Sequence, residues 1–154
     1  MSFKSDLEKG EEMEQVVIEV LSADWIQLIK NPDNRGADLL IVTDSIEVKL
    51  DDMSNKTGNF FLEYECNWKK SGVYKQEDVP VKWWAHSDWN KILLISMKFL
   101  IRWVSNRVDE CNKNKTKTSR WARIIQSWGD WGRVTGLVVP KEELENIAYK
   151  TYNL

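Results

Sequence analysis

The sequence has 154 residues, of which 42% are hydrophobic and 30% are charged, and its net charge is −2. This is the size and composition of one ordinary globular domain, so we expect residues 1–154 to fold as a single unit. No apolar run could cross a membrane and the polar start does not resemble a signal peptide, so we expect a cytoplasmic protein without a membrane partner. Two cysteines and one histidine are too few for a Cys/His metal site.

The first predicted element is a helix over residues 5–22. Ser5-Asp6-Leu7-Glu8 matches a capping box, and apolar residues then recur at mostly helical spacing. These residues are Leu7, Met13, Val16, Val17, Val20 and Leu21. The acidic residues on its first half form either a solvated face or, in the case of Glu14 or Glu11, part of a site.

Short strands are predicted next, over residues 24–30, 39–42 and 46–50, where large apolar residues are bounded by turn residues. A tight turn at residues 43–45 joins the last two strands as a hairpin. On the final strand, Glu47 and Lys49 share one face, because side chains alternate between the two faces of a strand. Asp38, at the start of the neighbouring strand, can bring a second carboxylate to the same edge.

Glu47 and Lys49 therefore place two charges on a strand whose other residues suit burial, which is a costly arrangement. Two carboxylates and a lysine form a candidate Mg²⁺ site with a cation beside it. The alternative is a surface hairpin that carries an ordinary ion pair.

The second half of the chain also alternates between strand and helix patterns. We expect strands at residues 59–65, 92–95 and 136–140, and helices at residues 97–108 and 140–149. In the first of these strands Phe60, Leu62 and Tyr64 share one face. Together these elements predict an α/β fold in which a mixed central β-sheet is flanked by helices. We expect that single sheet to hold Asp38, Glu47, Lys49 and Glu63 close together.

Basic residues gather between residues 98 and 133, although the chain is slightly acidic as a whole. Such a flank could grip a phosphate backbone or could simply be a solvated face. Residues 112–119 have the polar, lysine-rich composition of a mobile segment, and its lysines are Lys113, Lys115 and Lys117. The nine tryptophans could stack on bases, although most tryptophans serve cores and interfaces.

The pattern Asp38, eight residues, then Glu47-Val48-Lys49 resembles the catalytic motif of the PD-(D/E)XK nuclease superfamily. Three later segments are similar to phage and bacterial members of that family, and they occur in the expected order over most of the chain. They are TGNFFLEYECNWKKSGV, the Ser87-Asp88-Trp89 position with its following apolar strand, and Gly136-Leu-Val-Val-Pro140. The chain departs from the family pattern in the long tract at residues 73–86 and in the polar tract at residues 109–123.

This resemblance implies a restriction-endonuclease-like core and a Mg²⁺-dependent endonuclease that hydrolyses DNA, with branched, recombination or repair intermediates among the candidate substrates. Mn²⁺ could substitute for Mg²⁺. In this interpretation Asp38 and Glu47 hold metal together with the Val48 carbonyl, and Lys49 orients the attacking water or steadies the phosphate. Glu14, or else Glu11 or Glu63, completes the site, and Lys69, Lys70 and Ser71 contact the DNA backbone, joined by Lys113, Lys115 and Lys117 from the basic loop. A homodimer would suit cleavage of both strands.

Two other functions remain open at this point. The first is a module with a nuclease-like fold that binds DNA or a protein without cutting. The second is a purely structural α/β domain.

Overall fold

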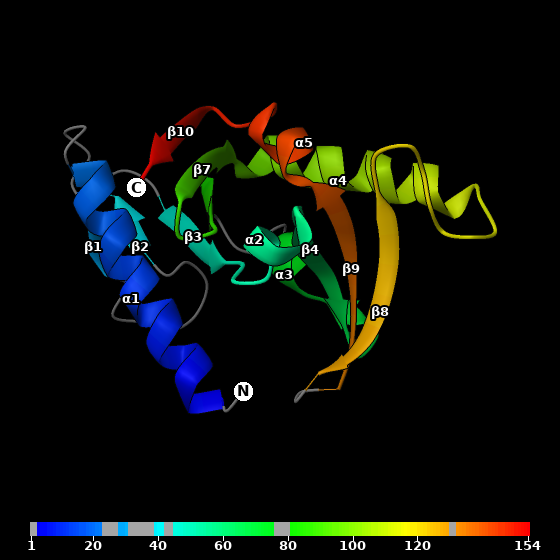
Figure 1. Ribbon diagram of the computed structural model, residues 1–154, viewed down its shortest axis with the longest axis horizontal. Helices are drawn as coiled ribbons and strands as arrows, with labels where there is room; N and C mark the ends of the chain where they lie inside the picture. The colour runs from blue at the N-terminus through cyan, green and yellow to red at the C-terminus, as the bar shows by residue number, and fades with distance from the viewer. Residues whose placement is uncertain (1–2, 23–27, 31–38, 42–44, 76–80, 130–131) are drawn as a thin grey trace. The chain divides into compact units, whose positions relative to one another are not determined.

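A computed structural model describes residues 3–22, 28–30, 39–41, 45–75, 81–129 and 132–154 (Figure 1). Contacts divide the chain into two compact units. The first consists of Met1–Asp52, Pro80–Ser96 and Ala148–Leu154, and the second of Met53–Val79 and Met97–Ile147. Whether the whole chain behaves as one folding domain stays a prediction.

The first unit is built on a six-stranded mixed sheet with the strand order β1-β2-β3-β6-β7-β10. Its strands are β1 (Leu28–Lys30), β2 (Leu39–Ile41), β3 (Ser45–Leu50), β6 (Trp83–Ser87), β7 (Lys91–Ser96) and β10 (Lys150–Asn153). β3 and β6 pair in parallel, whereas the other neighbours are antiparallel. β3 is therefore an inner strand, with β2 on one side and β6 on the other.

Helix α1 (Phe3–Ser22) packs on β1 and β3 of this sheet (Figure 1). Met13, Val17 and Leu21 recur every four residues, so they fall on one side of the helix, and all three are fully buried. They share a core with Ile46 and Val48 of β3. The predicted helix over residues 5–22 thus corresponds to α1.

The second unit contains a four-stranded antiparallel sheet with the order β5-β4-β9-β8. The strands are β4 (Asn59–Cys66), β5 (Lys69–Lys70), β8 (Arg123–Gly129) and β9 (Gly132–Pro140), and the helices are α2 (Ser54–Thr57), α3 (Gly72–Lys75), α4 (Met97–Asn112) and α5 (Lys141–Glu145). Phe60, Leu62 and Tyr64 of β4 are buried, as their alternation predicts. Leu100 and Val104 bury one side of α4, which contacts β8 and β9.

The α/β class and the mixed sheet are confirmed, but two predicted details are wrong. β4, which carries Glu63, does not join the sheet of β3, because the partner of β3 on that side is β6. The last helix is also shorter than residues 140–149. It ends at Glu145, and the backbone N–H of Tyr149 then donates to the Leu94 carbonyl, which starts the pairing of β10 with β7.

Candidate functional site

Glu47 and Lys49 lie on β3 with their charged groups in contact. Lys49 Nζ is 2.7 Å from Glu47 Oε1. The Glu47 side chain is only 7% exposed, whereas that of Lys49 is 43% exposed. The pair thus has a shielded carboxylate and an ammonium group that solvent, or a charged ligand, can reach.

The parallel neighbour β6 supplies the surroundings of this pair. Glu47 lies opposite Trp84, and Lys49 lies opposite His86. Lys49 Nζ is 6.0 Å from the centre of the buried Trp84 ring, which gives the ammonium group an aromatic neighbour. Trp84 Nε1 donates a hydrogen bond of 3.1 Å to His86 Nδ1, and His86 Nε2 is 3.9 Å from Asp51 Oδ2. Residues of β3 and β6 therefore form one continuous polar and aromatic cluster.

The end of β3 is tied to α1 through Asp52. Lys9 of α1 donates a hydrogen bond to Asp52 Oδ2, and Trp89 Nε1 donates one of 2.6 Å to Asp52 Oδ1. These contacts fix the helix along the strand that carries Glu47 and Lys49. On α1, Glu14 is half-buried whereas Glu11 is exposed. Which of the two glutamates contributes to a site on this sheet stays a prediction.

The Lys9 hydrogen bond lowers the pKa of Asp52 below its usual value, and the Trp89 N–H acts in the same direction. A carboxylate whose pKa is lowered by folding stabilises the fold above its unfolded pKa, and this contribution is lost as the pH falls through about 4 and below. We expect Asp52→Asn to lower the free energy of unfolding at pH 7, and we expect the deficit to shrink at about pH 3. Urea unfolding at both pH values, with the exposed Asp109→Asn as control, checks this. A deficit that does not change with pH would contradict it.

The other predicted metal ligands are only partly placed. Asp38 lies outside the described residues, and the Val48 backbone is part of β3 between β2 and β6. Glu63 belongs to the second unit, where Ser71 Oγ donates a hydrogen bond to its Oε1. Among the residues that the structure describes, no three His, Cys, Asp or Glu side chains gather as a metal-ligand group. The shielded Glu47 carboxylate is nevertheless the kind of oxygen donor that Mg²⁺ takes.

The predicted DNA-contacting lysines lie on the surface of the second unit. Lys69 and Lys70 form the exposed strand β5, and Lys113, Lys115 and Lys117 lie exposed in the segment after α4. This segment is hydrogen-bonded to itself: Asn114 Nδ2 donates to the Thr118 carbonyl at 2.6 Å, and Lys117 Nζ donates to Asn112 Oδ1 at 2.8 Å. Its mobility stays a prediction.

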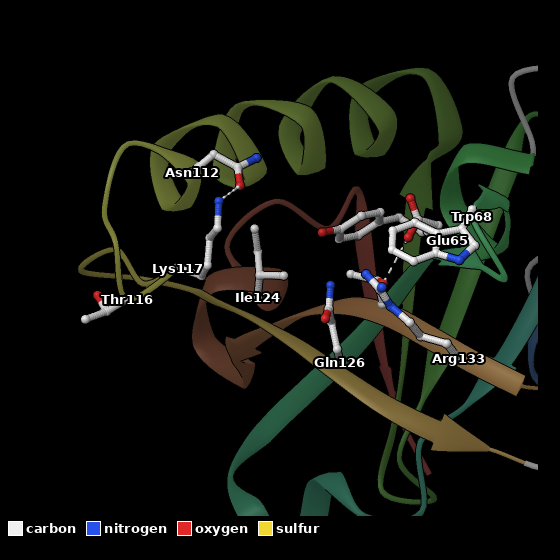
Figure 2. A pocket seen from close by; sticks show the side chains of 10 residues that line it. Glu65, Trp68, Asn112, Thr116, Lys117, Ile124, Gln126 and Arg133 are labelled. Carbon is white, nitrogen blue, oxygen red and sulfur yellow. Dashed lines mark hydrogen bonds between the residues drawn. The ribbon is translucent and has the colours of Figure 1, made fainter.

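A pocket of about 480 Å³ in the second unit was not foreseen from the sequence (Figure 2). Its lining comes from β4, the β4–β5 turn, the last residue of α4, the segment after α4, and strands β8 and β9. The lining residues are Tyr64, Glu65, Trp68, Asn112, Thr116, Lys117, Ile124, Gln126, Arg133 and Thr135. Only Lys117 among them belonged to the predicted site, and the one sequence signal for the rest was the abundance of tryptophan near cations.

No protein-family model, curated protein or solved structure matches the chain. None of the described helices is long and apolar enough to cross a membrane.

Proposed function

We propose that the protein is a Mg²⁺-dependent endonuclease that hydrolyses DNA phosphodiester bonds at the Glu47–Lys49 pair. The single observation that carries this proposal is the shielded Glu47 carboxylate, 2.7 Å from a partly exposed ammonium group on an inner strand. The sequence resemblance to PD-(D/E)XK nucleases supports the same assignment. The finer fold, a restriction-endonuclease-like core, belongs to this proposal as well.

A stabilising role explains this pair poorly. Moving the Glu47 carboxylate out of water costs several kcal/mol, and solvent screens its attraction to a lysine that stays 43% exposed. An apolar residue in the place of Glu47 would avoid that cost. A charged pair at this place is therefore better explained by chemistry that needs both charges.

Glu47 would hold the metal ion together with Asp38 and the Val48 carbonyl. Asp38 directly precedes Leu39, and Leu39 pairs with Ile46, which directly precedes Glu47. When bound, the metal supplies Lewis-acid stabilisation of the phosphate and a more acidic water. Glu14 on α1 is the next candidate carboxylate, and a second-metal role for Glu63 stays a prediction.

Lys49 would act on the substrate, because an ammonium group cannot be a metal ligand. Its partly exposed Nζ can donate a hydrogen bond to the attacking water or to a phosphate oxygen, and so stabilise the charge that develops in the transition state. The Trp84 ring, which stacks on His86 of β6, lies 6.0 Å from this ammonium group, and the Glu47 carboxylate is 2.7 Å away. Both neighbours would favour the charged form of Lys49 that this role needs.

The test is incubation of the purified protein with branched, nicked, single-stranded and linear duplex DNA, in Mg²⁺ or Mn²⁺ and in EDTA. We expect cleavage of at least one substrate with either metal and none in EDTA. Binding without cleavage of any substrate would instead identify the alternative, a DNA-binding module on a nuclease-like fold. The enzyme would work in the cytoplasm, and a homodimer would suit cleavage of both strands.

The basic segment after α4 gives a separate prediction about DNA binding. Replacing Lys113, Lys115 and Lys117 by alanine should weaken binding and flatten its dependence on salt, by about one unit of slope for each of these lysines that binds a phosphate group. The control replaces two other exposed lysines of the same unit that lie outside the basic stretch of residues 98–133, Lys56 and Lys75. Binding measured between low and high salt checks this, and an equal change of slope for each lysine removed in the two variants would show that the segment is only solvated.

A further inference from the structure

We propose that the pocket of the second unit binds one unpaired guanine nucleotide of a DNA strand, with the base stacked on Trp68 and its Watson–Crick edge facing Glu65. The choice of DNA rests on the proposed function. The pocket itself is a separate feature, because all its lining residues belong to the second unit, whereas Glu47 and Lys49 belong to the first.

Trp68 is held exposed by an unusual turn. Asn67 and Trp68 form the two-residue turn between β4 and β5, with φ angles of 48° and 66°. Two left-handed residues are what a tight hairpin turn needs, but a bulky tryptophan rarely occupies this region of φ. Strained backbone of this kind is often found at functional sites. The hydrophobic effect favours burial of this ring, yet Trp68 is 72% exposed.

The turn is fixed to β9 from both sides. The Asn67 N–H donates to the Arg133 carbonyl at 2.8 Å, and the Arg133 N–H donates to Asn67 Oδ1 at 3.0 Å. Gly132, with a φ of 113°, lies so close that a Cβ there would overlap the Asn67 side chain. The backbone of the turn that carries Trp68 is therefore held in place against β9.

Arg133 lies against the exposed Trp68 ring and adds a positive charge to it. Its Cζ lies 3.6 Å from the centre of the Trp68 ring, which places the guanidinium group against one face. The large exposed area of the ring remains available to a flat ligand. An exposed aromatic ring next to a cation is the usual platform for bases of a single strand, since the ring stacks on the base and the cation attracts the phosphates.

The pocket beside this platform fits a nucleotide in size and chemistry. Its volume of about 480 Å³ is in the range of small-molecule sites. Figure 2 shows Trp68, Arg133 and Glu65 at one end of the pocket and Lys117 with Asn112 at the other. Ile124 adds an apolar side chain and Gln126 an amide. Stacking, hydrogen bonding and phosphate attraction are thus all available to one ligand.

Glu65 gives the pocket its expected preference for guanine. One of its oxygens accepts a hydrogen bond of 3.1 Å from Thr135 Oγ1, and an ionised carboxylate has about four acceptor sites, so capacity remains. Guanine has two adjacent donors on its Watson–Crick edge, N1–H and the N2 amino group, which match a carboxylate, whereas thymine has one donor between two acceptors. That edge is accessible only when the base is unpaired, so duplex DNA should not enter the pocket.

Positive charge around the pocket, together with the exposed aromatic ring, fits a nucleic acid as the ligand. Lys69 and Lys70 follow the turn directly, and Lys113, Lys115 and Lys117 occupy the segment that borders the far end. Several cations around one aromatic platform suit a ligand with regularly spaced phosphates.

The test measures binding of short DNA probes to the full chain in EDTA, which prevents cleavage. The probes are a ten-residue thymidine oligonucleotide, the same oligonucleotide with one central guanine, and the latter as a duplex. We expect the wild-type protein to bind the guanine probe about tenfold more tightly than the all-thymine probe. Trp68→Ala should lose at least about tenfold for the single-stranded guanine probe and little for the duplex.

Two variants make the test specific. Trp121 is also exposed and stacked by an arginine, Arg120, but it does not line the pocket, so Trp121→Ala is the matched control and should bind like wild type. Glu65→Gln should bind the guanine and all-thymine probes about equally. Wild-type binding of the guanine probe by Trp68→Ala, or a guanine preference that survives in Glu65→Gln, would overturn the proposal. Cleavage of DNA by the wild-type protein in Mg²⁺ tests the nuclease proposal separately, because the binding measurements in EDTA do not depend on metal-dependent cleavage.

Discussion

Replacing Lys49 by alanine is expected to lower the rate of DNA cleavage by a factor of about 10²–10³, the usual cost of removing one preorganised donor from a transition state. DNA binding and metal binding should persist, because an ammonium group is not a metal ligand. Loss of the cation 2.7 Å from Glu47 makes the electrostatic potential at the carboxylate more negative, so the affinity for a metal ion should hold or rise.

The matched comparison for this variant is Glu47→Gln, which keeps the shape of the side chain but removes its charge. It should lose metal affinity together with cleavage. Calorimetric titration with Mg²⁺ or Mn²⁺, beside single-turnover cleavage, separates the two variants. Cleavage by Lys49→Ala at the wild-type rate would show that Lys49 takes no part in the reaction.

Replacing Gly72 by alanine should destabilise the protein by about 3 kcal/mol, as the sum of two effects. Gly72 has a φ of 48°, and the left-handed conformation costs a residue with a Cβ about 1–2 kcal/mol. A Cβ there would also overlap the backbone carbonyl of Glu63, and overpacking of this kind adds about 1–3 kcal/mol. The preceding residue, Ser71, is bonded to Glu63 and to the Tyr64 carbonyl, so the neighbouring backbone has little freedom to move away.

Gly58 provides the control, because it has a φ of 70° but no atom within 4 Å of an added Cβ. Gly58→Ala should therefore show only the conformational cost of about 1–2 kcal/mol. Urea unfolding of both variants measures the difference between them. Equal losses in the free energy of unfolding would mean that the backbone relieves the overlap between the added Cβ and the Glu63 carbonyl without cost.

The helices and strands of this fold could be predicted where local periodicity of the sequence determines them. The helical spacing of its apolar residues predicted α1, in which Met13, Val17 and Leu21 are buried whereas Leu7 is exposed, and the alternation in β4 fits the burial of Phe60 and Leu62. Alternation tells which face of a strand is buried, but it does not tell which strand lies beside it. For this reason the sheet that β4 joins could not be predicted, and neither could the parallel pairing of β3 with β6.

In the candidate site, too, contacts within one strand could be predicted from the sequence, whereas contacts between distant segments could not. The contact between Glu47 and Lys49 follows from the two-residue period of a single strand, so the sequence was sufficient to predict it. The neighbours Trp84 and His86 depend on the register between strands that are far apart in the chain. The Trp68 pocket depends on two left-handed residues and on the docking of Asn67 against β9, and no sequence period encodes either feature.

We propose that the Glu47–Lys49 pair is the centre of a metal-dependent nuclease. The most direct measurement compares DNA cleavage by wild type and Glu47→Gln, purified in parallel, in Mg²⁺ and in EDTA. We predict cleavage by the wild type in Mg²⁺ alone, and none by Glu47→Gln under either condition. Equal cleavage by the two proteins, or no cleavage of any DNA by the wild type, would contradict it.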